Sequence, residues 1–209
     1  MKQVYEDLWQ SELYSSGILN THAYLLTRPN GNILFYNTGS VSDLEHISEL
    51  GGIKYQLLTH RDEVGKSLQR IKEQFSSKLG IGILEAPYAQ KHTSVDIKFE
   101  TTDTQLEDIE VYFTPGHSEG SICYCYQSPY GKTYLFSGDS IFMWDRKWST
   151  FVIKGFNGTN EDMVNSLKKL RELKPNAVLS SGFIGTTSYE ELTNDEWITA
   201  IDSCIVKLV

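Results

Sequence analysis

The chain has 209 residues, of which 40% are hydrophobic and 22% charged, and its formal net charge is −8. This composition is that of an ordinary globular protein with enough residues for one well-packed core, so we expect a single domain over residues 1–209. A net negative chain repels a phosphate backbone, which argues against nucleic acid as a partner.

The predicted elements begin with strands. Residues 22–39 predict two strands joined by the turn Pro29-Asn30-Gly31, because Asn-Gly readily takes the positive φ of a tight hairpin. The run over 53–60 predicts a short strand that ends in polar residues. Apolar residues then recur at spacings of three and four, which predicts an amphipathic helix with the face Val64, Leu68, Ile71, Phe75 and Leu79.

The second half continues the interleaving of strands and helices. Strand-like runs cover 109–116, 121–126 and 133–139, and Cys123 and Cys125 alternate in the second run like buried small residues on one face. A helix capped by Thr159 or Asn160 and stopped by Pro175 follows. A strand over 176–183 and a last helix around Trp197 complete the chain, so we expect sheets covered by helices.

No apolar run approaches the roughly 20 residues of a membrane helix, and the acidic first residues do not resemble a signal peptide. The three cysteines cannot all pair. We therefore expect a cytoplasmic, reduced protein that does not bind membranes. The sequence is compatible with a monomer or a homodimer.

The segment TPGHSEGS, residues 114–121, has two competing interpretations. Gly116 to Gly120 fits G-x-S-x-G, the turn that exposes a nucleophilic serine between a strand and a helix. Here a strand-like run follows, and none of the five histidines comes after Ser118 in the chain. The sequence therefore favours a loop in which His117 is a metal ligand and Ser118 is a turn residue.

Three strand-ending loops carry residue types that bind metals. The first holds His60 and Asp62, the second His117 and the third Asp139. A rigid sheet can bring such loops together, and two imidazoles with two carboxylates suit zinc, or iron or manganese in a two-histidine-one-carboxylate set.

The order of these motifs, LLTHRDEVG, TPGHSEGS and LFSGDSIF, resembles that of the metallo-β-lactamase fold superfamily over roughly residues 15–185. The resemblance implies an α+β fold, a four-layer αββα sandwich with a metal site at one edge. It also implies that His60, His117 and Asp139 are metal ligands and that Asp62 matches the aspartate of the first motif.

The resemblance is incomplete at the site. Leu58 and Glu63 stand where the first motif has histidines, and the loop at Gly182 lacks the final histidine. Asn37 replaces the aspartate of the early DTG motif. The remaining ligands suffice for one divalent ion, zinc or iron or manganese, although the site could also hold none. Glu63 is either an additional oxygen ligand or a glutamate favoured at the start of a helix.

The resemblance favours a one-metal hydrolase that acts on a small-molecule substrate, with Asp62 orienting the attacking water or accepting its proton. The loop after Asp139 offers pocket residues: Trp144 and Trp148 for stacking and Arg146 for an anion, with His22 as a further candidate. Two alternatives stay open. One is a non-catalytic, ligand-binding member of the same fold, and the other is a mononuclear iron protein that oxidises sulfur compounds.

Overall fold

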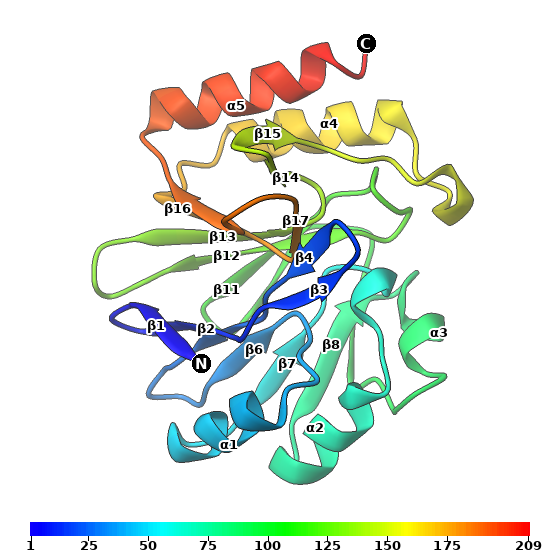
Figure 1. The fold of residues 1–209 in the computed structure, drawn as a ribbon. Helices are drawn as coiled ribbons and strands as arrows, with labels where there is room; N and C mark the ends of the chain where they lie inside the picture. The colour runs from blue at the N-terminus through cyan, green and yellow to red at the C-terminus, as the bar shows by residue number, and fades with distance from the viewer.

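Two large β-sheets form the framework of the protein, which a computed structural model describes over residues 1–209 (Figure 1). The first sheet has the order β1 (Lys2–Tyr5), β2 (Leu8–Gln10), β5 (Tyr24–Leu26), β6 (Ile33–Phe35), β7 (Tyr55–Leu57), β8 (Lys78–Gly82) and β9 (Ile97–Phe99). The second has the order β10 (Thr104–Leu106), β11 (Ile109–Phe113), β12 (Ile122–Gln127), β13 (Thr133–Gly138), β16 (Ala177–Ser180) and β18 (Tyr189–Glu191).

The β5–β6 hairpin forms as predicted. Its strands pair antiparallel, with Leu25 opposite Leu34. At the turn the amide of Gly31 donates to the carbonyl of Arg28 at 3.1 Å, and Gly31 has a φ of +102°, which a glycine adopts at little cost. The predicted turn therefore sets the register of the first sheet.

Helices cover the outer faces of both sheets. α1 (Val41–Glu49), α2 (Ser67–Phe75) and α3 (Ala86–Ala89) lie on the first sheet, and α4 (Asn160–Arg171) and α5 (Asn194–Val206) lie on the second. Apolar residues from both sheets fill the space between them, and a separate cluster under α4 and α5 includes Met163, Trp197, Cys123 and Cys125. The expected mixed α/β, four-layer sandwich is confirmed.

Both ends of the predicted helix over Val64–Leu79 are wrong by a few residues. α2 begins at Ser67, and Val64 lies before it, in extended conformation after a 3-10 helix over Arg61–Glu63. α2 ends at Phe75, because Ser76 takes the left-handed conformation with a φ of +53°. Leu79 therefore belongs to β8 and not to the helix face, although it packs against Leu68 in the same apolar cluster. The helical spacing of apolar residues continues past Ser76, so this spacing alone could not reveal that the helix ends there.

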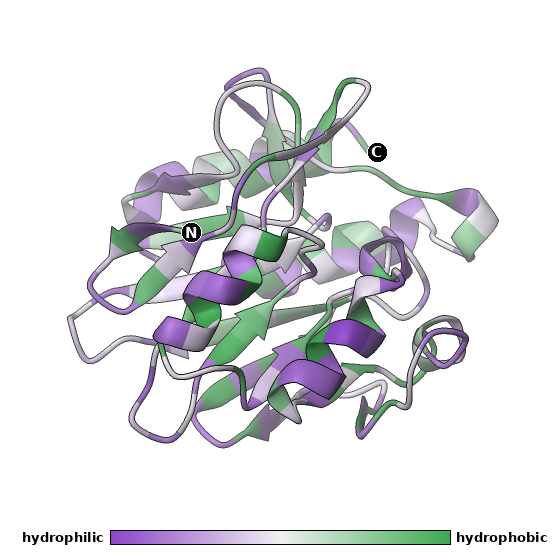
Figure 2. Ribbon diagram, turned by 60° about the horizontal axis from the view of Figure 1, so that its bottom comes forward, coloured by the Kyte–Doolittle hydropathy of each residue, from purple (hydrophilic) through white to green (hydrophobic).

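Two smaller sheets flank the framework. One contains β17 (Gly182–Phe183), β4 (Leu19–Thr21) and β3 (Tyr14–Ser16), and the other pairs β14 (Phe142–Trp144) with β15 (Lys147–Ser149). The strands at the centre of the molecule are mainly hydrophobic, whereas the helices mix hydrophobic and hydrophilic residues (Figure 2). None of the helices has both the length and the apolar character to span a membrane.

Candidate metal centre

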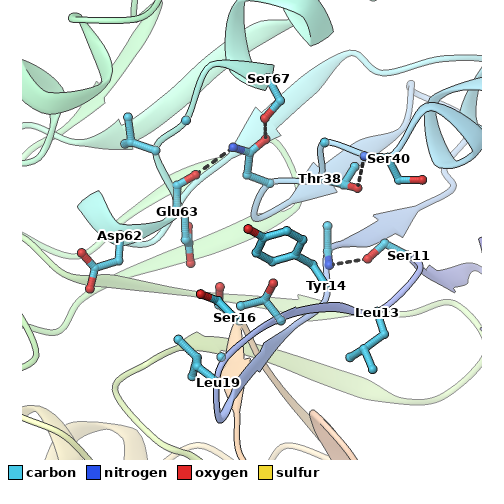
Figure 3. A pocket seen from close by; sticks show the side chains of 18 of the residues that line it. Ser11, Leu13, Tyr14, Ser16, Leu19, Thr38, Ser40, Asp62, Glu63 and Ser67 are labelled. Carbon is cyan, nitrogen blue, oxygen red and sulfur yellow. Dashed lines mark hydrogen bonds between the residues drawn. The ribbon is translucent and has the colours of Figure 1, made fainter.

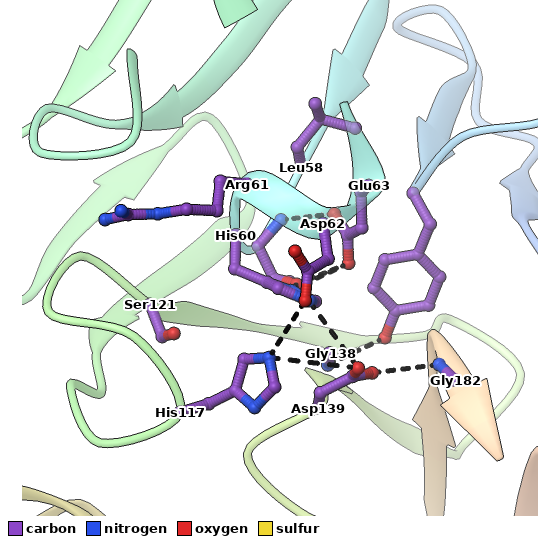
Figure 4. Close-up of polar contacts among 12 residues, drawn as sticks. Leu58, His60, Arg61, Asp62, Glu63, His117, Ser121, Gly138, Asp139 and Gly182 are labelled. Carbon is purple, nitrogen blue, oxygen red and sulfur yellow. Dashed lines mark hydrogen bonds and ion pairs between the residues drawn. The ribbon is translucent and has the colours of Figure 1, made fainter. Parts of the chain in front are cut away.

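Loops from both large sheets meet at one end of the sandwich (Figure 4). His60 follows β7 and His117 follows β11, while Asp139 follows β13. The Nε2 atom of His60 lies 3.6 Å from Oδ2 of Asp139, and Nε2 of His117 lies 4.0 Å from the same oxygen. Asp62 adds an oxygen 3.7 Å from Nε2 of His117. The structure thus brings together the residues that the sequence singled out.

Both imidazoles present an unpartnered nitrogen to this shared space. His60 and His117 are 1% and 2% exposed, and the Nε2 atom of each lacks a hydrogen-bond partner. Their other nitrogens are occupied: Nδ1 of His117 donates to the Phe151 carbonyl at 2.8 Å, and Nδ1 of His60 donates to the Thr59 hydroxyl at 2.9 Å. Buried polar atoms are rarely left unpaired without a reason.

This arrangement fits a divalent metal ion. Histidines that bind metals usually donate the second ring nitrogen to a carbonyl or a carboxylate, which fixes the ring and leaves the other lone pair free. Ligand atoms on a tetrahedral zinc ion stand about 3.4 Å apart, given bond lengths near 2.1 Å. The observed separations of 3.6 Å and 4.0 Å are close to that value.

Glu63 approaches His60 from the side opposite to the shared space. Its carboxylate accepts the Thr59 amide at 2.7 Å and the Thr59 hydroxyl at 2.5 Å, and it lies 3.3 Å from Nδ1 of His60. The side chain is only 3% exposed, so it is not a solvated residue at the start of a helix. Glu63 is placed to orient His60, a role that neither interpretation of the sequence had included.

The electrostatics of the centre couple these groups. Burial opposes protonation of His60, but the carboxylates of Glu63 and Asp139 outweigh it and raise the pKa of His60 well above its usual value. Burial likewise disfavours the charged form of Asp139, yet His60 and the Gly182 amide hold the pKa of Asp139 below its usual range. Without a metal ion, the centre therefore favours a proton on His60 beside the ionised carboxylate of Asp139.

Leu58 does not face the centre. It is fully buried in an apolar cluster with Leu68, Leu79 and Ile81, under α2 and α3, and Figure 4 shows its side chain directed away from His60. Only its backbone carbonyl serves the site region, by accepting the Tyr124 hydroxyl at 2.7 Å. The position that carries a histidine in the resembling family is therefore a core position here.

Gly182 occupies the place of the missing final histidine. Its amide donates to Oδ1 of Asp139 at 2.9 Å, and a Cβ atom there would stand 3.2 Å from both carboxylate oxygens. Asn37, which replaces the aspartate of the early motif, donates to the backbone carbonyl of Glu63 at 2.9 Å. Both residues hold elements of the site in position and offer no ligand atom to it.

A buried ion pair joins the first and second ligand loops, and no pattern in the sequence predicted it. Arg61, between His60 and Asp62, forms bonds of 2.6 Å and 2.9 Å with the carboxylate of Glu85, which is fully buried. Glu85 also accepts the Ser118 hydroxyl at 2.8 Å. Ser118 is thus buried in this network and is not an exposed nucleophile.

A cavity of about 770 Å³ opens beside the centre (Figure 3). His60, Asp62, Glu63 and Asp139 form one wall, and residues of the β3–β4 hairpin such as Tyr14 form another. None of these residues of the hairpin was expected at the site, since the short, mixed segment over 14–21 has no clear strand pattern.

The pocket residues predicted from the sequence lie elsewhere. Arg146 and Trp148 line a different, shallow depression against α5, and Trp144 bridges to Ile184. His22 bonds to the Ser11 carbonyl at 2.9 Å and stacks on Phe183. None of these four residues lines the cavity beside the metal centre. The β14–β15 hairpin, which carries Trp144, Arg146 and Trp148, packs against α5 instead of over the site.

Comparisons with known proteins agree with this geometry. A sequence model described as the metallo-beta-lactamase superfamily matches residues 43–182. A hydroxyacylglutathione hydrolase from Klebsiella pneumoniae subsp. pneumoniae is 28% identical over 160 residues, which are 74% of this chain and 58% of that protein. The chain therefore matches only somewhat more than half the length of that relative.

Solved structures show the same fold at low sequence identity. A metallo-beta-lactamase from Pontibacter korlensis superposes with a TM-score of 0.74 at 15% identity, covering 99% of this chain and 97% of that one. A metallo-beta-lactamase from Cronobacter sakazakii, described by its HARLDQ motif, gives a TM-score of 0.62 at 18% identity and covers 86% of this chain and 76% of that one.

Proposed function

Because the chain belongs to the metallo-β-lactamase superfamily, we propose that it is a hydrolase with a single divalent metal ion, zinc or iron, held by His60, His117 and Asp139. The observation that supports this proposal most directly is the pair of buried, unpartnered Nε2 atoms that face one carboxylate. The similarity to a protein named as a hydrolase supports the same reaction class.

The ion supplies Lewis acid chemistry when bound, by polarising a carbonyl or phosphoryl oxygen and lowering the pKa of a coordinated water toward ~7. Asp62 stands beside His117 with 45% of its side chain exposed, so it faces both the ligand atoms and the cavity. We assign to Asp62 the task of orienting the attacking water and accepting its proton. The Phe151 carbonyl and the Thr59 hydroxyl keep both imidazoles in the tautomer that coordinates.

The ligand set supports one ion and not two. Leu58 is committed to the core, Glu63 is bonded to Thr59, and Gly182 has no side chain. A second ion would have Asp62 and Asp139 but neither of the histidines that stand at positions 63 and 182 in the family pattern. Three protein ligands with one open position are the usual set for a catalytic zinc ion.

Elemental analysis of protein purified without added metal tests this proposal, together with zinc titration of the metal-free form. We expect one ion per chain and hydrolysis of a general ester or thioester. His117→Ala removes a ligand and should abolish both, whereas His92→Ala, at an exposed position, should change neither. If the protein binds no transition metal, the hydrolase proposal is wrong and the non-catalytic, ligand-binding alternative is favoured. Iron accompanied by oxidation of a thiol, without hydrolysis, would instead establish the sulfur-oxidising alternative.

A further inference from the structure

The charge of the cavity is strongly one-sided. Four carboxylates line it, from Glu12, Asp62, Glu63 and Asp139, and no lysine or arginine does. Arg61 is adjacent in sequence but its guanidinium is bound to Glu85 and Glu119. Even without Glu63, whose carboxylate is bonded to Thr59, the three carboxylates of Glu12, Asp62 and Asp139 exceed the two positive charges of one divalent ion. The cavity therefore retains a negative potential when the metal centre is filled.

Glu12 fixes a negative charge at the mouth of the cavity, away from the ligand atoms. Its carboxylate accepts the hydroxyls of Ser40 at 2.9 Å and Ser42 at 2.7 Å, and its amide donates to Asp43 at 3.1 Å. The two hydroxyls lower the pKa of Glu12 below its usual value. This side chain is therefore held in place as an ionised group, although it plays no part in holding the metal ion.

An exposed aromatic ring lines the same cavity as this carboxylate. Glu12, Tyr14 and Ser16 all line the cavity, Glu12 from the segment before β3 and the other two from β3 itself. Tyr14 is 68% exposed, and Figure 3 shows its ring directed into the cavity toward Glu63. A cavity lined by a carboxylate and an open aromatic ring can bind an ammonium group, through charge attraction and the electron-rich face of the ring.

We propose that the substrate carries a positively charged ammonium group, which Glu12 and Tyr14 bind at the mouth of the cavity. This inference rests on the proposed hydrolase function. With the ammonium group at the mouth of the cavity, the bond that is cut lies at the inner end, beside His60 and Asp139. An anionic substrate of the same size meets several carboxylates and no lysine or arginine along the cavity and is disfavoured.

Three acetyl thioesters of similar size test the proposal on the zinc-loaded protein. Acetylthiocholine ends in trimethylammonium, S-(3,3-dimethylbutyl) thioacetate ends in the neutral tert-butyl group, and the third ends in a carboxylate. Each hydrolysis consumes one water, breaks the C–S bond and yields acetate, a thiol and a proton. We expect kcat/KM for the cationic thioester to exceed that for the anionic one by about tenfold or more, with the neutral one between them.

Two variants, each lacking one negative charge, test whether the preference for the cationic thioester comes from Glu12 itself or from the net charge of the chain. Glu12→Gln should reduce the preference for the cationic over the neutral thioester severalfold. Glu172→Gln removes the same charge from an exposed position at the end of α4 and should preserve the preference. Equal loss in both variants would mean that only the net charge of the chain matters and would overturn the proposal.

Binding measured by calorimetry separates this proposal from the proposed function. Choline should bind the zinc-loaded protein more tightly than 3,3-dimethylbutanol, and Glu12→Gln should remove the difference. If choline binds in this way but no thioester is cleaved, the hydrolase proposal fails while the charge preference stands. If all three thioesters are cleaved equally well, the hydrolase proposal stands and the charge preference is wrong. If neither choline nor any thioester binds, the ammonium site is refuted.

Discussion

The carboxylate of Glu63 lies 3.3 Å from Nδ1 of His60, while the other nitrogen of the same ring lies 3.6 Å from Asp139. The His60 imidazole thus stands between two carboxylates. Glu63 orients the ring through Nδ1, and Asp139 lies on the side of Nε2, the nitrogen that would coordinate the metal ion. The Thr59 hydroxyl links the ring to Glu63, since it accepts from His60 and donates to the carboxylate. Glu63 therefore acts on the metal centre through His60.

Replacing Glu63 with glutamine should weaken zinc binding by about 10- to 100-fold, the usual effect of losing a partner behind a coordinating histidine. The change removes the negative charge that favours the oriented ring but keeps a side chain of the same size. Competition with a chelator measures the affinity, and Glu49→Gln at an exposed position of α1 is the matched control. Equal zinc affinity in the Glu63 and Glu49 variants would show that Glu63 has no such role.

Zinc binding should release a proton near neutral pH. In the metal-free protein, Glu63 and Asp139 overcome the effect of burial and raise the pKa of His60, so the ring stays protonated at a pH where a free histidine is neutral. The metal ion must displace this proton, and its apparent affinity should therefore rise with pH until His60 deprotonates by itself. Calorimetry in two buffers of different ionisation enthalpy counts the protons, and a count of zero at pH 7 would contradict the prediction.

The raised pKa of His60 also makes the stability of the metal-free protein fall with pH, whereas the apparent zinc affinity rises with pH. A histidine with a higher pKa in the folded than in the unfolded state stabilises the fold below the unfolded value near 6.5, and this contribution is lost as pH rises through the folded pKa. We expect the metal-free protein to lose stability across that range, and the zinc-loaded protein to be spared this loss. Thermal unfolding at a series of pH values distinguishes the two forms.

Restoring a histidine at position 58 should not restore a ligand. Leu58 packs between Leu68 and Ile81, so Leu58→His buries a polar ring without a partner and should cost about 2 kcal/mol or more of unfolding free energy. Zinc stoichiometry should stay at one per chain. Urea denaturation provides the measurement, and Leu58→Met, which keeps the volume, should cost less than about 1.5 kcal/mol. A second bound zinc ion in Leu58→His would refute the assignment of this position to the core.

Removing Glu85 should destabilise the fold and loosen the metal centre together. Glu85→Ala removes the fully buried partner of Arg61 and leaves it only the partly exposed Glu119 as a charged partner, so we expect a loss of about 3 kcal/mol. It also frees Ser118 next to His117, so zinc affinity should fall as well. Asp202→Ala breaks the exposed pair with Arg171 and should change stability little. A similarly small effect for Glu85→Ala, measured by denaturant unfolding, would show that the pair does not join the two loops.

Much of the fold followed from local patterns. Asn30-Gly31 dictates a tight hairpin because few residues other than glycine accept the positive φ of Gly31, and Thr159 begins α4 because its side chain accepts the Asp162 amide. The helix ends at Arg171, before Pro175. The positions of His60, His117 and Asp139 at strand ends were also visible, since each stands next to a turn-forming residue. These features depend on a few neighbouring residues and can therefore be predicted from the sequence alone.

The tertiary structure decided what each polar residue faces. Leu58 and His60 are two positions apart, yet one enters the core under α2 and the other the metal centre, because β7 ends at Leu57 and the chain then turns into a short 3-10 helix over Arg61–Glu63. Arg61 meets Glu85 across 24 residues, and Tyr14 reaches the cavity only because the β3–β4 hairpin pairs with β17. Contacts between distant segments depend on how the sheets and loops pack, and local sequence carries no record of that packing.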